Sequence, residues 1–387
     1  MAEVAVTRKG QQRLEEGHLW IYRSDIVIKG KEPAPGSIVS VLSPKRQLLG
    51  QAFYSSKSQI SLRLLTSTSE KINRDFWRSR LQMALELRKQ IVSQAEAYRL
   101  IHGDGDLIPS LVIDRYQDYF VIQTLSQATD QLRQMWVELL EEMFQPKAII
   151  ERNDVKVRNL EGLPEQTGLL LGTLPEALVV TQNNIRFNID LLTGQKTGLF
   201  LDQRENHLVA QSYAYGRALD CFTFNGGFAL NMAKTAKSVL AVDISEAAIN
   251  QAKHNAALNQ FSNITFQTAN IFDLLKTFDE QQEQFDTIVL DPPAFAKNRS
   301  AVEAAIRGYK EINLRALKLL KPGGVLISCT CSYNISEEMF LGILQSAAND
   351  TNRRLQLLEK RTQSRDHPIL LAVPETYYLK CSILRVI

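Results

Sequence analysis

The second half of the chain alternates short apolar runs with amphipathic stretches of helical spacing, and this pattern strongly limits how the chain can fold. Strands are predicted at 218–222, 239–243, 264–266, 287–290 and 325–329. Strands separated by helices of about 10 to 15 residues indicate βαβ units and a parallel sheet. Two later β-like runs, 355–358 and 377–384, are expected to complete it. The sequence therefore predicts an α/β fold over 176–387.

Two smaller domains are predicted before this sheet. Residues 1–70 read as short strands with turns, which favours a small β-barrel. Residues 71–175 predict an α+β domain, with a helix capped by Asn73, a strand pair at 111–125, a helix at about 130–144 and a strand at 148–150. The stretch 153–178 is expected to be an irregular linker.

Composition excludes several classes of protein. The 387 residues contain no apolar run of the ~18 residues that a bilayer span needs, and the first ten residues do not resemble an export signal. The four cysteines show no zinc-ligand spacing. We expect a cytoplasmic protein with reduced thiols, no metal site and no membrane partner, and the sequence leaves open whether it forms a homodimer.

Positive charge gathers in the first domain. Residues 1–70 hold ten Lys and Arg against six acidic residues, whereas the whole chain has a net charge of +3. A basic unit on a nearly neutral body is typical of proteins that bind a polyanion, although a solvated surface explains the excess as well.

Polar residues follow successive strands of the predicted sheet. Asp220 is followed by a turn with Gly226 and Gly227, Asp243 ends the next strand, and Asn270 follows the third. Glycines allow close approach of the backbone to a ligand, an acid about 20 residues on can accept ribose hydroxyls, and an amide can read an adenine edge. The G-x-G-x-x-G spacing of dinucleotide folds is missing. The pattern therefore indicates a nucleoside without a pyrophosphate, namely S-adenosyl-L-methionine.

The stretch 291–295, Asp-Pro-Pro-Ala-Phe, ends the fourth strand. Two prolines stiffen the loop, so that it can hold a flat group beside the carboxylate of Asp291. In open α/β sheets ligands bind at this edge. We expect the loop to form the floor of an active site.

Several motifs together carry a resemblance to a known family. They are 219–228 (Leu-Asp-Cys-Phe-Thr-Phe-Asn-Gly-Gly-Phe), 242–245, 291–295, Cys331-Ser332, 195–204 and 365–368 (Arg-Asp-His-Pro). In these the chain resembles bacterial ribosomal-RNA cytosine-5 methyltransferases with an N-terminal PUA domain. The resemblance implies a Rossmann-like class I methyltransferase domain, preceded by a PUA-like RNA-binding barrel and the α+β middle domain, that acts on large-subunit ribosomal RNA.

The motifs also define the expected cofactor residues. S-adenosyl-L-methionine is expected to contact Phe200, Gln203, Arg204, Asp220, Phe222, Asn225, Gly226, Gly227, Asp243, Ile244, Ser245, Asn270 and Asp291. Lys196 and the residues 200–204 could cover the cofactor or hold phosphate, but a capped helix starting at Asp202 explains them equally well. Cations at 297–299 and 307–310 are candidates for an RNA-binding rim or an exposed helix start.

The predicted reaction requires a cysteine. Carbon 5 of cytosine is a poor nucleophile, so a thiolate must add to carbon 6, which yields an enamine able to attack the methyl sulfonium. Cys331 lies at the carboxyl edge of the fifth strand and is the predicted nucleophile. Cys329 would share its side of the strand by parity and is predicted to be a small buried residue.

Asp291 is expected to contact the base near its exocyclic amine. Many related enzymes outside the PUA-bearing type carry a second cysteine after the two prolines, where this chain has Ala294. The base that releases the product is therefore open: Asp291, another side chain or water. The target base should be single-stranded or flipped out of its helix.

Two other functions fit parts of the sequence. A methyltransferase acting on guanine N7 or an adenine amine would need no thiolate. A non-catalytic RNA-binding ribosome-assembly factor could keep the fold alone, but the acids Asp220, Asp243 and Asp291 favour an enzyme.

Overall fold

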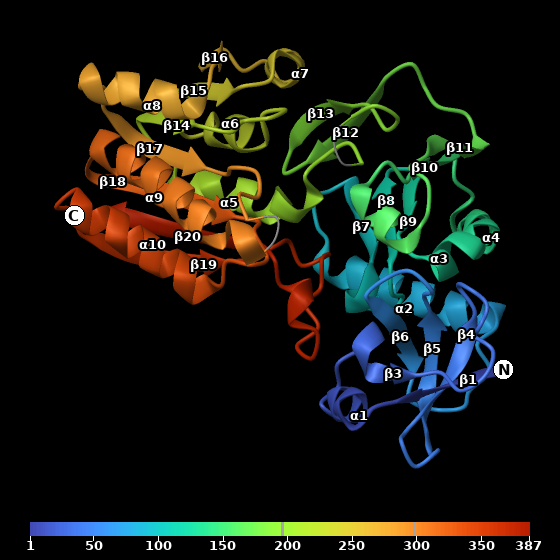
Figure 1. Ribbon diagram of the computed structural model, residues 1–387. Helices are drawn as coiled ribbons and strands as arrows, with labels where there is room; N and C mark the ends of the chain where they lie inside the picture. The colour runs from blue at the N-terminus through green and yellow to red at the C-terminus, as the bar shows by residue number, and fades with distance from the viewer. Residues whose placement is uncertain (195–196, 297–298) are drawn as a thin grey trace. The chain divides into compact units, whose positions relative to one another are not determined.

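The computed structural model describes residues 1–194, 197–296 and 299–387, and its contacts divide the chain into two units. Unit 1 comprises 1–180, 189–199 and 365–376, and unit 2 comprises 181–188, 200–364 and 377–387. Figure 1 shows both units with their elements labelled. Lys196, Lys297 and Asn298, which the sequence offered for cofactor or RNA contacts, lie outside the described residues.

The first sheet of unit 1 has six strands in the order β2-β6-β5-β4-β1-β3. They are β1 (Ala2–Val6), β2 (Trp20–Tyr22), β3 (Ile26–Val27), β4 (Ile38–Leu42), β5 (Leu48–Tyr54) and β6 (Ile60–Thr66). Alternate apolar residues such as Val4, Val39 and Leu62 are fully buried and form its core. Helix α1 (Arg8–Glu15), begun by the side chain of Thr7, was not predicted.

The second sheet of unit 1 has the order β11-β10-β9-β8-β7. Its strands are β7 (Ala97–His102), β8 (Leu111–Tyr116), β9 (Tyr119–Thr124), β10 (Ala148–Arg152) and β11 (Thr167–Gly172). Helix α2 (Arg74–Ile91) begins as predicted, because Asn73 accepts a hydrogen bond from the Phe76 N–H at 3.1 Å. Trp77 of this helix stacks on Phe53 at 5.5 Å, within the same unit.

The helix predicted at about 130–144 is confirmed as α4 (Arg133–Phe144), whereas the short helix before it, α3 (Gln127–Gln131), which a capping box between Ser126 and Thr129 starts, was not predicted. One expectation for this region was wrong. The stretch 153–178 is not wholly irregular, since β11 lies within it and pairs antiparallel with β10. Its half-buried position at a sheet edge weakens the sequence signal.

The segment 365–376 belongs to unit 1 although it follows most of unit 2 in sequence. Asp366 holds it there: its carbonyl accepts from Arg88 Nη2 at 2.7 Å, and its Oδ2 accepts from the Arg99 N–H at 2.9 Å. The segment thus completes a fold whose other residues lie far earlier in the chain.

Unit 2 is built on a seven-stranded sheet of order β16-β15-β14-β17-β18-β20-β19. The strands are β14 (Arg217–Asp220), β15 (Ser238–Asp243), β16 (Ile264–Thr268), β17 (Phe285–Leu290), β18 (Leu320–Thr330), β19 (Leu355–Arg361) and β20 (Lys380–Val386). The first five are parallel, as predicted, and β20 is antiparallel to its neighbours β18 and β19. A short pair, β12 (Leu178–Gln182) and β13 (Ile185–Ile189), precedes them.

Helices cover this sheet on both faces. They are α5 (Arg204–Tyr213), α6 (Gly227–Met232), α7 (Glu246–Leu258), α8 (Ile271–Glu280), α9 (Val302–Leu319) and α10 (Glu337–Asp350). One core joins α8, α9 and α10 to the sheet, and another joins α5 and α6 to it. The strand predicted at 377–384 begins only at Lys380, and the hydroxyls of the two tyrosines before it donate to Glu337 and Asp202.

None of the described helices is long and apolar enough to cross a membrane. The division into three domains at 70 and 175 stays a prediction.

Candidate active site

The order of the sheet places the predicted site residues side by side. Asp220 ends β14, Asp243 ends β15, and Asn270 follows β16, whereas Asp291 and Cys331 come directly after β17 and β18. These five strands are consecutive in the sheet and parallel, so their carboxyl ends share one edge. The sequence turns back between β14 and β17, which is the switch point where open α/β sheets bind ligands.

Asp220 is wholly buried below the turn that follows β14. Its Oδ2 accepts a hydrogen bond from the Ala229 N–H at 3.0 Å, which ties the carboxylate to α6. Its Oδ1 and the hydroxyl of Thr223 have no hydrogen-bond partner among the described residues. Burial raises the pKa of Asp220 to about 7. Such an oxygen suits a polar or cationic group of a ligand.

The two glycines of the turn have different roles. Gly226 has a φ of +94°, a backbone angle that residues other than glycine rarely adopt. A Cβ at Gly227 would lie 2.4 Å from the His207 ring, so this glycine makes room for a neighbouring side chain of the protein. The expectation that both glycines serve close approach of a ligand therefore has a competing reason at Gly227.

Asp243 is held at the end of β15 by two backbone donors. Its Oδ2 accepts from the Phe224 N–H and its Oδ1 from the Ser245 N–H, both at 2.9 Å. Ser245 also starts α7 by accepting from the Ala248 N–H. Beside the carboxylate, Ile244 is 71% exposed. The pair offers an acceptor for hydroxyls next to an apolar surface for a flat ring.

Asn270 caps α8, because its Oδ1 accepts from the Phe272 N–H at 2.9 Å. A role for its amide in reading an adenine edge stays a prediction. Asn225 is buried and its carbonyl accepts from Asn255 Nδ2 at 3.0 Å, while Phe222 is half-buried against the core.

The segment before α5 lies close to the same turn. The Phe200 ring meets the Phe224 ring edge-on at 4.9 Å. Gln203 is buried and its Oε1 accepts from Asn206 Nδ2 at 2.6 Å, whereas its Nε2 has no partner within the described part of the chain. Arg204 is buried at the start of α5 and lies 3.5 Å from Glu205. The segment thus brings buried polar groups to the site as well as starting a helix.

Cys331 lies beside the Asp-Pro-Pro loop. Its Sγ is 4.0 Å from the carbonyl oxygen of Pro292, and the thiol is partly exposed. The two segments are tied together by the Ala296 N–H, which donates to Ser332 Oγ at 3.2 Å. The structure therefore brings the predicted nucleophile and the predicted base-holding loop to one place.

Cys329 differs from Cys331 in every respect. It is fully buried among apolar residues and lies opposite Cys381 in the pairing of β18 with β20. Burial raises the pKa of its thiol well above the usual range. The prediction of a small buried residue is confirmed. The parity argument was wrong, because β18 ends at Thr330 and Cys331 is already outside the strand.

Sequence reasoning missed a hydroxyl cluster next to Cys331. Tyr309 of α9 accepts from Thr330 Oγ1 at 2.8 Å and shares a hydrogen bond of 2.9 Å with Ser332. Burial raises the pKa of Tyr309, so its hydroxyl stays neutral. The sequence offered Tyr309, within 307–310, as part of an RNA-binding rim, and this was wrong for Tyr309, because it is fully buried.

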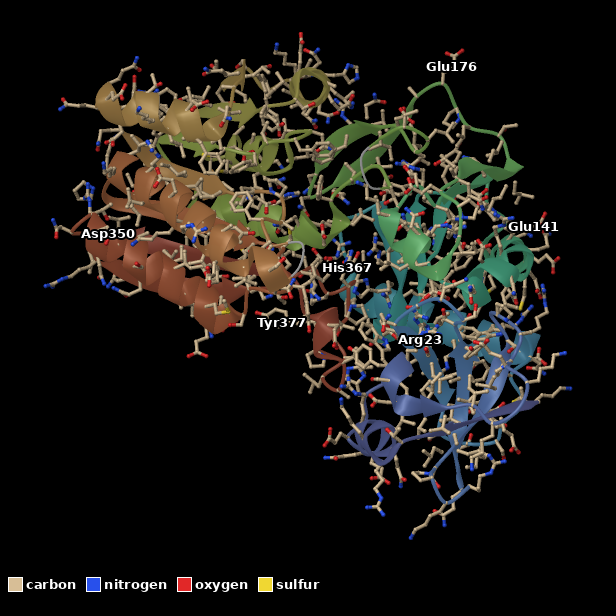
Figure 2. All side chains as sticks on the ribbon, in the orientation of Figure 1. Arg23, Glu141, Glu176, Asp350, His367 and Tyr377 are labelled. Atoms are coloured by element: carbon tan, nitrogen blue, oxygen red, sulfur yellow. The ribbon has the colours of Figure 1, made fainter. Side chains whose placement is uncertain are left out.

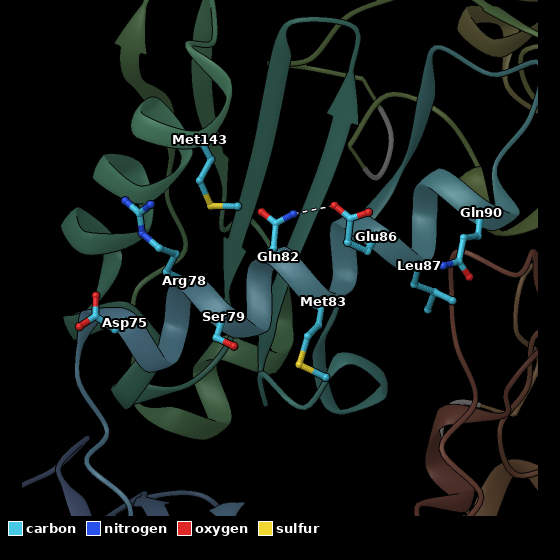
Figure 3. Close-up of a pocket in the computed structure, with 9 residues that line it drawn as sticks. All are labelled: Asp75, Arg78, Ser79, Gln82, Met83, Glu86, Leu87, Gln90 and Met143. Carbon is cyan, nitrogen blue, oxygen red and sulfur yellow. Dashed lines mark hydrogen bonds between the residues drawn. The ribbon is translucent and has the colours of Figure 1, made fainter.

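Unit 1 has a separate hollow of about 620 Å³ along α2 (Figure 3). It is lined by Asp75, Arg78, Ser79, Gln82, Met83, Glu86, Leu87, Gln90 and Met143. Gln82 donates to Glu86, one turn further along α2, at 2.6 Å. None of the strand-end residues lines it, and we leave it out of the candidate site.

The strand-end residues fit S-adenosyl-L-methionine. Asp243 could hold the ribose hydroxyls, Ile244 could pack on the adenine, and Asp220 with Gln203 offers unused buried polar atoms for the amino-acid end. The sheet order and this edge define a class I methyltransferase fold.

Comparisons with known proteins agree. A family described as S-adenosylmethionine-dependent methyltransferase matches residues 99–370, and a PUA-like domain matches residues 4–67. Two solved structures share the fold over 100% of both chains at 21% identity: a methyltransferase complexed with SAH, with a TM-score of 0.86, and a SAM-dependent methyltransferase from Streptococcus mutans, with 0.83. The cofactor of this class is S-adenosyl-L-methionine.

Curated relatives narrow the class. A protein of Tolumonas auensis is 40% identical over 99% of both chains, and one of Vibrio parahaemolyticus is 38% identical over 99% of this chain and 100% of its own. One of Shewanella amazonensis is 40% identical over 97% of both. Since all three are named Ribosomal RNA large subunit methyltransferase I, the chain belongs to that family of S-adenosylmethionine-dependent methyltransferases.

Proposed function

We propose that the protein transfers a methyl group to carbon 5 of a cytosine in large-subunit ribosomal RNA, with Cys331 as the covalent nucleophile. The RNA substrate follows the name of the relatives. The base and the mechanism rest on one observation, the thiol of Cys331 next to the Asp-Pro-Pro loop, 4.0 Å from the carbonyl of Pro292. A purine methyltransferase has no use for a thiol there.

In this proposal, Cys331 adds as a thiolate to carbon 6 of the ring and thereby makes carbon 5 nucleophilic. S-adenosyl-L-methionine, when bound, supplies the methyl group. After transfer, the proton on carbon 5 must leave and the bond between carbon 6 and sulfur must break, which restores the thiolate. Ala294 provides no second thiol for this step.

Asp291 is proposed to orient the base. It follows β17 directly, and the two prolines after it keep the loop extended. A carboxylate at this point can accept a hydrogen bond from the exocyclic amine of cytosine, which uracil lacks. The remaining cofactor contacts are proposed for the strand-end residues and for the segment 200–204.

The first sheet of unit 1 is proposed to bind RNA. Its residues match a PUA-like domain and carry more basic than acidic side chains. Arg8, Lys29, Lys31 and Lys45 form no ion pair among the described residues. Free cations of this kind suit phosphate contacts. A ribosomal RNA substrate would place the protein in the cytoplasm.

The test is a comparison of Cys331→Ala with Cys329→Ala. Ribosomal RNA from cells lacking the protein, complemented by each variant, is digested and analysed by mass spectrometry for 5-methylcytosine. We expect Cys331→Ala to abolish the modification and Cys329→Ala, which removes a buried thiol of β18, to retain it.

A second assay tests the covalent step. RNA carrying 5-fluorocytosine cannot lose a proton from carbon 5, so wild-type protein should remain attached to it in denaturing gels. Full formation of 5-methylcytosine by Cys331→Ala would contradict the role of Cys331, and loss of a methylated purine instead of 5-methylcytosine in cells lacking the protein would favour a purine target. Failure of the wild type to bind S-adenosyl-L-methionine in calorimetry would favour a non-catalytic factor.

A further inference from the structure

Lys380 opens β20 at the point where this strand meets the end of β18. Its Cα partner is Thr330, the last residue of β18, and Cys331 is the next residue along the chain. Residues directly opposite in an antiparallel pair place their side chains on the same face. The register therefore brings Lys380 to the end of β18, one residue before the candidate nucleophile, and the charge of Cys331 acts on the Lys380 amine.

The ammonium of Lys380 is poorly compensated. The residue is only 4% exposed, and its Nζ donates to the carbonyl of Tyr378 at 3.3 Å. It also lies 5.0 Å from the centre of the Tyr377 ring, which is labelled in Figure 2. No carboxylate within the described residues forms an ion pair with it. A lysine is almost never buried in this way unless it is paired, so an unpaired one suggests a functional role.

The burial of Lys380 makes its amine a competent base. Burial lowers the pKa of Lys380 to about 8, while charges on Cys331 and Glu337 act in the opposite direction. Glu337 is itself engaged, since it accepts from Tyr377 at 2.9 Å and pairs with Lys360 at 2.6 Å. An amine of this pKa is well matched to a thiol, whose usual pKa is about 8.5.

We propose that Lys380 takes the thiol proton of Cys331 and holds the thiolate beside its ammonium. The S–H bond breaks with both electrons left on sulfur, and the lone pair of Nζ forms the new N–H bond. A cation next to a thiol favours the thiolate. Lys380 is thus a positioning residue, which prepares Cys331 for its attack on the cytosine ring. The inference rests on the proposed role of Cys331 as nucleophile.

The test measures the thiol without the RNA substrate. The full chain is alkylated with iodoacetamide over a range of pH, and the modified peptide containing Cys331 is quantified by mass spectrometry. We expect a midpoint below about 8.5 in the wild type, a rise of at least about one pH unit in Lys380→Met, and a low midpoint retained in Lys380→Arg. Lys318→Met is the control, because Lys318 is exposed and pairs with Asp279 at 2.8 Å.

An unchanged midpoint in folded Lys380→Met would overturn the inference. If that variant does not fold, an NMR titration of labelled lysine in Cys331→Ser gives the reciprocal measurement: loss of the thiolate should lower the pKa of Lys380, and an unchanged pKa overturns the inference. The outcomes remain separable. An active Cys331→Ala refutes the proposed function, whereas an inactive Cys331→Ala with a thiol pKa independent of Lys380 refutes only this inference.

Discussion

Several charged groups of the two units differ in how their charge is compensated. In unit 1 three arginines pair with carboxylates whose side chains are at most 3% exposed: Arg88 pairs with both oxygens of Asp106, Arg99 lies 2.8 Å from Asp114, and Arg63 lies 2.8 Å from Glu161. In unit 2 the buried ionisable groups at the sheet edge, Asp220 and Lys380, have no ion-pair partner among the described residues, and their pKa values are shifted.

The difference separates charged groups that fix the structure from charged groups that can exchange protons. A buried pair fixes geometry and keeps both groups ionised over a wide pH range, so it cannot exchange protons near neutrality. An unpaired buried group is costly for stability, and its pKa moves toward the pH at which proton transfer is useful. Asp220 and Lys380 lie at the sheet edge of the candidate active site.

Breaking a pair in unit 1 should have the largest effect on stability. Arg88→Met leaves the Asp106 carboxylate, whose side chain is 3% exposed, without its counter-charge. We expect a loss of about 3–5 kcal/mol in the free energy of unfolding, measured by urea denaturation. Arg74→Met, which breaks an exposed pair with Glu138, should cost less than about 1 kcal/mol. Equal losses in both variants would remove the contrast.

Removing the unpaired charge at Asp220 should raise the stability of the protein, whereas Arg88→Met lowers it. Its raised pKa means that the folded state holds a proton which the unfolded state has lost, so the wild type loses stability as pH rises from about 4 to about 7. Asp220→Asn should therefore be more stable than the wild type at pH 8, by at most about 4 kcal/mol, with the difference vanishing near pH 4.

Thermal unfolding of Asp220→Asn across this pH range is the measurement, and calorimetry should show weakened binding of S-adenosyl-L-methionine. A stability difference that does not change with pH would show that Asp220 is already ionised at pH 4.

A smaller effect is expected for the packing at the sheet edge. Gly227→Ala places a Cβ 2.4 Å from the His207 ring and should destabilise unit 2 by about 1–3 kcal/mol. His207→Ala in the same chain should relieve the clash. Gly342→Ala is the matched control, because nothing lies within 4 Å of its Cβ and alanine favours a helix by about 1 kcal/mol. If the double variant is no better than Gly227→Ala, the glycine has another role.

Local patterns predicted much of unit 2. The strands ending at Asp243 and Leu290 contain β-branched residues, and these two strands and the one ending at Asp220 have sharp polar stops; such signals lie within a few neighbouring residues. The start of α2 was predicted for the same reason, because the capping residue Asn73 and the backbone N–H that donates to it are three residues apart.

What the sequence did not show depends on distant partners. Helix α1 is rich in charge and has only Gly10 buried, so its apolar signal is weak. The position of Lys380 follows from the pairing of β20 with β18, and the cluster around Tyr309 follows from a helix packing on that pairing. Neither the strand pairing nor the helix packing can be predicted from the neighbouring residues alone.

The placement of Asp366 in unit 1 has a consequence for the order of folding. Its contact with Arg88 joins residues 278 positions apart, and the sequence of unit 2 lies almost entirely between them. Closing so long a loop is slow when the intervening chain is disordered and becomes easier once that chain has collapsed. During synthesis, the first unit to begin folding would therefore be the last to finish.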